Sequence, residues 1–229
     1  MTPTTLKQFS GFSPTALKFM RDLAKNNDRA WFAPRKPIYE RELLEPLQAL
    51  VADATDAMRK AKIQIGADPM RSTFRIYRDI RFSADKSPYK TNLGAFLSTR
   101  GSHDESGGLY VHIEPKKSFM AIAFYQLDKP VLLRWRTAMA EDPKRFQAMI
   151  RALERNGLKL SDQSEALKRM PRGFEHCAGS PIEKYFRIES FIVSEKLSDK
   201  DVSSRYLVDK MVALAKKAKP LLAYGRELT

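Results

Sequence analysis

The spacing of apolar residues changes at about Arg71, and this change constrains the fold more than any other feature of the chain. From Phe74 to Phe82 the even-numbered positions are apolar except for Arg78, while the odd-numbered positions from 75 to 81 are Arg, Tyr, Asp and Arg. Alternation with a period of two is typical of a β-strand with one buried face. Before this segment and after about residue 128, apolar residues recur at helical intervals.

Helical signals occupy both ends of the sequence. Ser13 can cap a helix that begins at Pro14, and a longer helix is expected to reach about Lys60 with a kink or a break at Pro46. Further helices are predicted to begin at Asp128–Pro130 and Asp142–Pro143 and to run from about Asp201 to Lys217.

Strand signals occupy the middle. Further strands are expected at Leu93–Ser98 and Arg187–Val193, and a hairpin is expected from Tyr110–Glu114 and Ser118–Tyr125. The order predicts an α+β fold, with a mainly antiparallel sheet flanked by N- and C-terminal helices. No Pro-rich or Gly/Ser-rich linker interrupts the chain, so a single domain, 1–229, is expected, with a helical part at about 13–60, a central sheet at about 71–125 and a second helical part at about 128–219.

Several function classes lack their sequence signals. Cys177 is the only cysteine, which excludes an intramolecular disulfide. The acidic and histidine residues near His103 and the pair His176–Cys177 match no metal-ligand spacing, so no built-in metal is expected, and no motif assigns a cofactor. Neither a signal-peptide pattern nor a run of about 18 apolar residues is present, which predicts a cytoplasmic protein without a membrane span.

The positive charge is concentrated around the alternating segment. The chain has a formal net charge of +14, and residues 71–100 contain seven basic and only two acidic side chains. Because an unpaired guanidinium is costly to bury, the polar face of this segment must be solvated or internally paired.

This segment is the candidate ligand site. Asp79 can neutralise one arginine at most, so positive charge remains for a ligand, and the guanidinium fork suits phosphate or carboxylate. We therefore expect a phosphorylated or carboxylated small molecule to bind here. The expected ligand-binding residues are Arg71, Arg75, Tyr77, Arg81, Lys86, Tyr89 and Lys90.

Acid/base residues lie in and near this site. Tyr110, His112 and Glu114 alternate onto one strand face, so His112 can act as an acid or base with Glu114 as its partner. Asp79 and Asp85 are the other candidate catalytic residues. A structural histidine is the alternative interpretation, and the residues do not decide between binding and turnover.

Two alternative functions stay open. The basic surface with Tyr77, Tyr89 and Tyr110 as stacking platforms would suit a nucleic acid. If the arginines and aspartates merely pair with one another, as on a charged edge strand, a structural or protein-interaction role remains.

The sequence also resembles a known family. The run Phe74–Thr91, which contains RFSADKSPYK, resembles a bacterial and fungal domain-of-unknown-function family of the DUF2461 type, whose members are conserved hypothetical proteins. Asn26–Asn27, Trp31–Phe32, Tyr39 and Gly108–Pro115 carry the same resemblance, which extends over about residues 8–215. The resemblance implies one domain without an established activity or assigned catalytic residues. One departure is Met120–Tyr125, where the family pattern has a glycine-rich hairpin.

Overall fold

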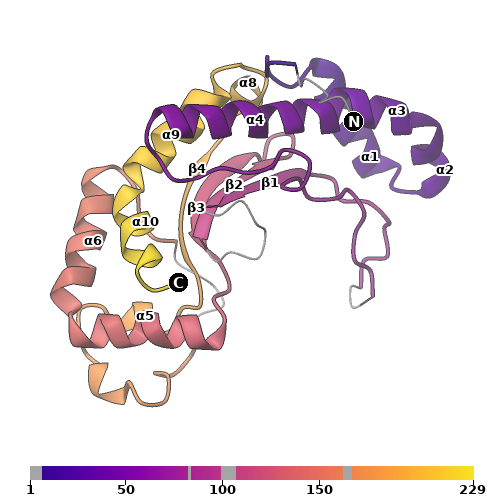
Figure 1. Ribbon diagram of the computed structural model, residues 1–229. Helices are drawn as coiled ribbons and strands as arrows, with labels where there is room; N and C mark the ends of the chain where they lie inside the picture. The colour runs from indigo at the N-terminus through magenta and orange to yellow at the C-terminus, as the bar shows by residue number, and fades with distance from the viewer. Residues whose placement is uncertain (1–6, 82–83, 99–106, 162–166) are drawn as a thin grey trace. The chain divides into compact units, whose positions relative to one another are not determined.

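The computed structural model describes residues 7–81, 84–98, 107–161 and 167–229. They form an α+β fold with a mainly antiparallel sheet flanked by N- and C-terminal helices, which confirms the predicted class (Figure 1). The sheet has the strand order β1-β2-β3-β4. No helix in these ranges is long and apolar enough to cross a membrane.

The elements follow the order that the hydrophobic periods predict. The N-terminal helices are α1 (Pro14–Lys25), α2 (Arg29–Phe32), α3 (Lys36–Tyr39) and α4 (Glu45–Lys60). The strands are β1 (Leu93–Ser98), β2 (Gly107–Ile113), β3 (Phe119–Phe124) and β4 (Phe191–Lys196). The remaining helices are α5 (Lys129–Glu141), α6 (Pro143–Arg155), α7 (Glu183–Phe186), α8 (Asp199–Val202), α9 (Leu207–Lys217) and α10 (Lys219–Arg226).

The described chain divides into two compact units. The first contains residues 7–81, 84–98, 109–120 and 195–213, and the second contains residues 107–108, 121–161, 167–194 and 214–229. The candidate site described below lies within the first unit.

The first unit has its core between α4 and the sheet. Leu47, Leu50, Val51, Ala54 and Met58 form a buried stripe on α4, and this helix contacts β1. Their helical spacing places them on one face, as an amphipathic helix requires. The strands contribute alternating buried residues, namely Leu93, Ala95 and Leu97 from β1 and Leu109, Val111 and Ile113 from β2.

The start of α1 and the region before α4 match two local sequence signals. The Ser13 hydroxyl accepts a hydrogen bond from the Ala16 N–H and caps α1, as predicted. The kink or break expected at Pro46 is not at the proline: a π-helical turn, Glu40–Leu44, directly precedes α4. Pro46 then lies in the first turn of α4, which continues directly from the π-helical turn.

The second unit is built around stacked aromatic rings. Trp135 stacks on Phe191 with 4.0 Å between ring centroids, and Phe124 packs beside Trp135 at 5.2 Å. A Cβ atom on Gly225 would lie 2.1 Å from the Phe124 ring, so only glycine fits at this position of α10.

Several predicted elements differ at their boundaries. The strand expected at Tyr110–Glu114 is β2, which begins at Gly107 and ends at Ile113. The strand expected at Arg187–Val193 begins at Phe191 instead and continues to Lys196. The last helix is divided into α8 and α9, because the Ser198 capping box starts a short helix that ends at Val202.

Candidate functional site

The segment before β1 differs from the continuous strand predicted for Arg71–Phe82. Two isolated antiparallel bridges, Thr73 to Ala95 and Tyr77 to Tyr89, take its place. Between the two bridges, the first segment covers four positions, from Thr73 to Tyr77, and the opposite segment covers six, from Tyr89 to Ala95. The opposite segment therefore contains two extra residues, which form a bulge. Bulges interrupt the regular ladder, which explains why an alternating pattern does not produce a full strand here. Phe82 itself lies outside the described residues.

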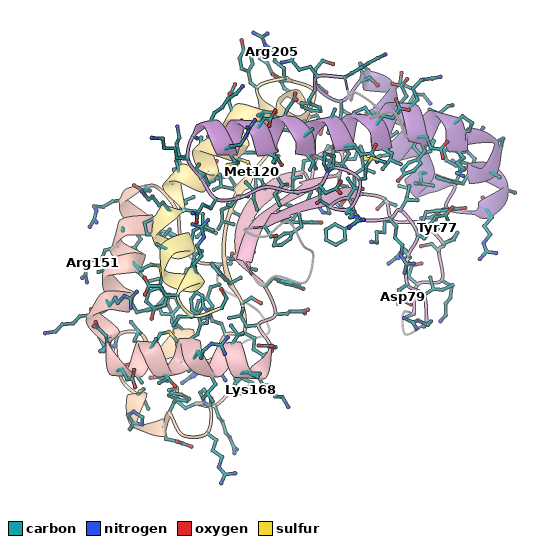
Figure 2. The ribbon with its side chains drawn as sticks, in the orientation of Figure 1. Tyr77, Asp79, Met120, Arg151, Lys168 and Arg205 are labelled. Atoms are coloured by element: carbon teal, nitrogen blue, oxygen red, sulfur yellow. The ribbon has the colours of Figure 1, made fainter. Side chains whose placement is uncertain are left out.

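The chain folds back on itself between Ile76 and Lys90. The N–H of Arg78 donates to the Pro88 carbonyl at 3.0 Å, and the N–H of Lys90 donates to the Ile76 carbonyl at 2.7 Å. We call this segment the hairpin, and its residues 78–81 and 84–87 the hairpin tip. Figure 2 shows Asp79 in the tip, farther from the sheet than Tyr77.

The charges of the hairpin tip are paired with one another. Arg81 donates from Nε and Nη2 to the two carboxylate oxygens of Asp79, at 3.0 and 2.7 Å. Arg78 forms an ion pair with Asp85 across the hairpin. The hydrogen bond from Arg81 holds the pKa of Asp79 at about 2. Both aspartates are therefore hydrogen-bonded acceptors, an environment that suits structural charge better than general-base chemistry.

Two further predicted ligand residues are exposed and have local partners. Arg71 lies 3.8 Å from Asp68, and its side chain is 86% exposed. The Lys86 ammonium donates to the Ile80 carbonyl at 2.9 Å. The structure therefore places both residues at the surface with contacts close in sequence.

The base of the hairpin is anchored to the N-terminal helices. Tyr89 is buried and stacks on Phe32 at 4.1 Å, and the Asn27 side-chain amide bonds both backbone groups of Tyr89, at 2.8 and 3.0 Å. Tyr77 packs beside Tyr89 at 5.5 Å but is 49% exposed. Of the two predicted tyrosines, Tyr89 thus holds the hairpin in place and only Tyr77 offers an open ring.

Arg75 and Lys90 differ from the other cations of the segment. Neither side chain forms an ion pair with a carboxylate in the described part of the chain. Lys90 is half-buried, and its ammonium lies 5.6 Å from the centroid of the Phe74 ring. Burial, and then the nearby charge of Arg75, lower the pKa of Lys90 below its usual value. Arg75 and Lys90 are therefore close enough for their charges to interact, and neither contacts a carboxylate in the described part of the chain.

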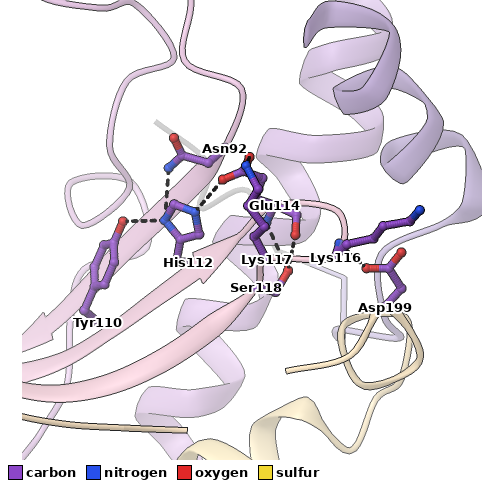
Figure 3. A network of polar contacts seen from close by, with 8 residues as sticks. All are labelled: Asn92, Tyr110, His112, Glu114, Lys116, Lys117, Ser118 and Asp199. Carbon is purple, nitrogen blue, oxygen red and sulfur yellow. Dashed lines mark hydrogen bonds and ion pairs between the residues drawn. The ribbon is translucent and has the colours of Figure 1, made fainter. Parts of the chain in front are cut away.

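Polar and aromatic side chains line the outward face of β2. Tyr110 and His112 alternate with the fully buried Leu109, Val111 and Ile113. The Tyr110 hydroxyl lies 3.1 Å from His112 Nδ1, and His112 Nε2 lies 3.2 Å from a carboxylate oxygen of Glu114 (Figure 3). The three side chains, which sequence alternation predicts on one face, thus form a connected row.

The neighbours of His112 indicate how its ring is protonated. The Asn92 amide nitrogen, which can only donate, lies 3.3 Å from Nδ1 (Figure 3). Nδ1 is then the acceptor, so the ring proton lies on Nε2 and is donated to the Glu114 carboxylate. An imidazole that is hydrogen-bonded to a carboxylate at one nitrogen and to a hydroxyl at the other has the arrangement of an acid/base group.

The positions of His112 and Glu114 are further fixed by β3 and the turn before it. The His112 ring stacks on Phe119 with 4.8 Å between centroids. The Glu114 carboxylate forms an ion pair with the Lys117 ammonium at 3.3 Å, and the backbone N–H of Glu114 donates to the Ser118 hydroxyl at 3.0 Å. The side chains of His112 and Glu114 are still 16% and 23% exposed, so a ligand can reach them.

Phe74 connects Lys90 to this row. Its ring meets Tyr110 edge-on at 5.9 Å, while Lys90 lies over it. Gly94 provides the room, because a Cβ atom there would lie 2.9 Å from the Tyr110 hydroxyl and 3.2 Å from the Phe74 ring. We define the sheet-face cluster as Phe74, Arg75, Lys90, Asn92, Tyr110, His112, Glu114 and Phe119.

The cluster includes only part of the predicted site. Of the predicted residues, Arg75, Lys90 and His112 belong to it, while Asp79, Arg81, Asp85 and Lys86 belong to the hairpin tip. Sequence reasoning missed Asn92 and Phe119. Asn92 follows Lys90 by two positions in the conspicuous run of residues 74–92, which is the one signal that could have drawn attention to it.

A comparison with known protein families gives a match over most of the chain. A family described as "Conserved hypothetical protein (DUF2461)" matches residues 15–224. Curated proteins and solved structures gave no match. Within the described residues, no group of three or more His, Cys, Asp or Glu side chains is arranged to hold a metal ion.

Proposed function

The chain belongs to the DUF2461 family of conserved hypothetical proteins, and we propose that it binds a phosphorylated or carboxylated small molecule at the sheet-face cluster. Arg75 and Lys90 bind the anionic group in this proposal. His112 carries a proton to or from the ligand, with Glu114 orienting its ring.

The observation that supports the proposal is the absence of an ion pair at Arg75 and Lys90 in the described chain. Like charges that lie close together repel, and partial burial strengthens this repulsion because less water screens it. A bound anion would relieve the repulsion and would offer the Arg75 fork two oxygen acceptors. The paired arginines of the hairpin tip gain less, since a ligand there must displace Asp79 or Asp85.

The proton-transfer part of the proposal rests on His112. Asp79 and Asp85 already accept hydrogen bonds in the tip, and neither contacts His112 in the described structure. His112 combines partial exposure with a carboxylate partner and a neighbouring hydroxyl. It is therefore the candidate we favour among the three predicted catalytic residues.

The nucleic-acid alternative has less support. A stacking surface needs open rings, and Tyr89 is buried against Phe32 while Tyr110 is only partly exposed. Binding to single-stranded DNA or RNA that weakens steeply with salt would favour this alternative over a small ligand.

The experiment compares two double variants by thermal unfolding in inorganic phosphate. Arg75→Ala/Lys90→Ala removes the unpaired cations, and Arg81→Ala/Lys86→Ala removes the same number of charges from the tip. We expect phosphate at about ten times its dissociation constant to raise the Tm of the wild type and of the tip variant by about 3–5 °C, and to leave the first variant unchanged.

Sodium chloride at matched ionic strength controls for general screening. If both variants keep the phosphate shift, or if chloride reproduces it, the proposed site is wrong. Unchanged phosphate binding by His112→Gln would agree with a histidine that handles protons and does not hold the anion.

A further inference from the structure

Lys90 differs chemically from the other lysines of the hairpin and the sheet. It is half-buried, it lies over the Phe74 ring, and it has no carboxylate partner in the described chain. Lys86 instead donates to the Ile80 carbonyl, and Lys117 pairs with Glu114. A lysine that lacks a counter-ion and is partly desolvated next to another cation has the environment of an amine nucleophile.

We propose that Lys90 forms an imine with the carbonyl group of an anionic aldehyde or ketone whose acidic group is bound by Arg75. This inference rests on the proposed function, because it uses the same site. It adds the chemical class of the ligand and a covalent step.

The backbone around Lys90 fixes the position of its amine. The N–H of Lys90 donates to the Ile76 carbonyl at 2.7 Å, and the preceding Tyr89 is held by Asn27 and Phe32. A nucleophile carried by an anchored segment meets a bound carbonyl in a reproducible geometry.

The charges that face Lys90 act in opposite directions. Burial and the Arg75 charge both lower the pKa of Lys90 and so increase the neutral fraction of its amine. The Phe74 ring attracts the protonated form. The lowered pKa indicates a larger reactive fraction than a fully solvated lysine has, and only the neutral amine attacks a carbonyl.

The reaction needs no oxidant or other co-reactant. The neutral amine nitrogen of Lys90 forms a bond to the carbonyl carbon. The nitrogen then loses one proton and the carbonyl oxygen takes one up, which gives a carbinolamine. Loss of the remaining nitrogen proton and of the hydroxyl group, which leaves as water, gives the carbon–nitrogen double bond. The cluster offers a hydroxyl and an imidazole for these proton transfers. Tyr110 contacts the Phe74 ring, and His112 lies 3.1 Å from the Tyr110 hydroxyl.

The test uses pyridoxal 5′-phosphate as a probe, because it combines a phosphate with an aldehyde. The full chain is incubated with the probe, the imine is reduced with cyanoborohydride, and the modified lysines are located by peptide mass spectrometry. We expect the reduced adduct on Lys90, its loss in Lys90→Arg, and its retention in the matched control Lys86→Arg. Arg75→Ala should reduce labelling of Lys90.

Pyridoxine 5′-phosphate separates this inference from the proposed function, since it carries the same phosphate and ring but no aldehyde. If it raises the Tm in an Arg75-dependent way while pyridoxal 5′-phosphate labels exposed lysines as much as Lys90, the imine inference is overturned and anion binding stands. If it does not bind and labelling is spread evenly over lysines, both are overturned. Mapping on the wild-type chain keeps the test decisive even where a variant folds poorly.

Discussion

The hairpin tip and the sheet-face cluster both contain cations, but they differ in how those cations are compensated. In the tip, Arg81 and Asp79 form a bidentate ion pair, and Arg78 forms an ion pair with Asp85. In the cluster, Arg75 and Lys90 lie near each other without an ion pair in the described chain. The number of positive charges in a segment therefore says less about a binding site than the positions of the nearby carboxylates.

The difference has a simple geometric origin. Asp79 and Asp85 lie in the tip and form their ion pairs with arginines of the tip. The charge of Arg75 also lowers the pKa of Asp79, but Arg81 has the larger effect. Lys90 lies at the base, where the Tyr89 ring is fixed against Phe32 and the chain is close to the sheet. Exposed pairs such as those of the tip contribute little to stability, whereas the packed base should tolerate substitution poorly.

Among the changes considered, Gly94→Ala should have the largest effect, and it should act on the sheet-face cluster. The added methyl group would lie 2.9 Å from the Tyr110 hydroxyl and 3.2 Å from Phe74, so both rings must move. We expect a loss of up to about 3 kcal/mol in the free energy of unfolding, measured by urea denaturation, together with loss of phosphate binding. Unchanged stability would contradict the tight packing described for this face.

High pH should destabilise the base of the hairpin next most strongly. Burial raises the pKa of Tyr39 to about 12, and Tyr39 packs against Phe32, which supports Tyr89. The folded pKa lies above the unfolded value of about 10, so this contribution is complete below pH 10 and is lost as the pH rises toward 12.

The expected loss over this pH range is on the order of 2 kcal/mol for Tyr39. Tyr39→Phe should therefore show a smaller decrease in the free energy of unfolding between pH 10 and pH 12 than the wild type. Equal slopes for the two proteins would mean that this phenol is not desolvated in the fold.

Asn27→Ala should have a smaller effect on the same region. It removes both hydrogen bonds to the Tyr89 backbone, at a cost of about 1 kcal/mol in the free energy of unfolding. Weaker phosphate binding should accompany the loss, because the hairpin base positions Lys90. Asn26→Ala is the matched control, since that side chain bonds the Asp22 carbonyl within α1; comparable loss of phosphate binding in both variants would contradict the anchoring role.

Asp79→Asn should have the smallest effect. Its pair with Arg81 is exposed, so no measurable change of Tm is expected at pH 7. The Asp79 pKa of about 2 is lower than the unfolded value, so any stabilisation by the pair is present above about pH 4 and is lost as the pH falls through 2. A large decrease of Tm at pH 7 would show that the tip is coupled to the core.

Much of the fold follows from local sequence signals. The predicted strand Leu93–Ser98 matches β1, and Ser13 and Pro14 mark the start of α1. These elements depend on hydrophobic period and on caps, which are readable within a few residues. The segment 71–82 is not the continuous strand that its alternation predicts. The segment opposite it contains two extra residues, and the alternation within 71–82 does not reveal how the two segments pair.

The sequence predicted several residues of the site but not how those residues are arranged. Alternation on β2 correctly grouped Tyr110, His112 and Glu114 into one row. The ion pair of Arg81 with Asp79, and the lack of one at Arg75 in the described chain, could not be read from their spacing, because both arginines lie an even number of positions from that aspartate. Only the turn in the chain decides which arginine the carboxylate meets.

The central claim is that an anion binds at the hairpin base and not at its tip. The most direct measurement follows the side-chain Nε–H resonances of the arginines by NMR while inorganic phosphate is added at constant ionic strength. We expect the Arg75 resonance to shift with phosphate until binding is saturated. The Arg81 resonance should not shift, because the Nε–H of Arg81 is already donated to Asp79. A saturable shift at Arg81 with none at Arg75 would contradict the claim.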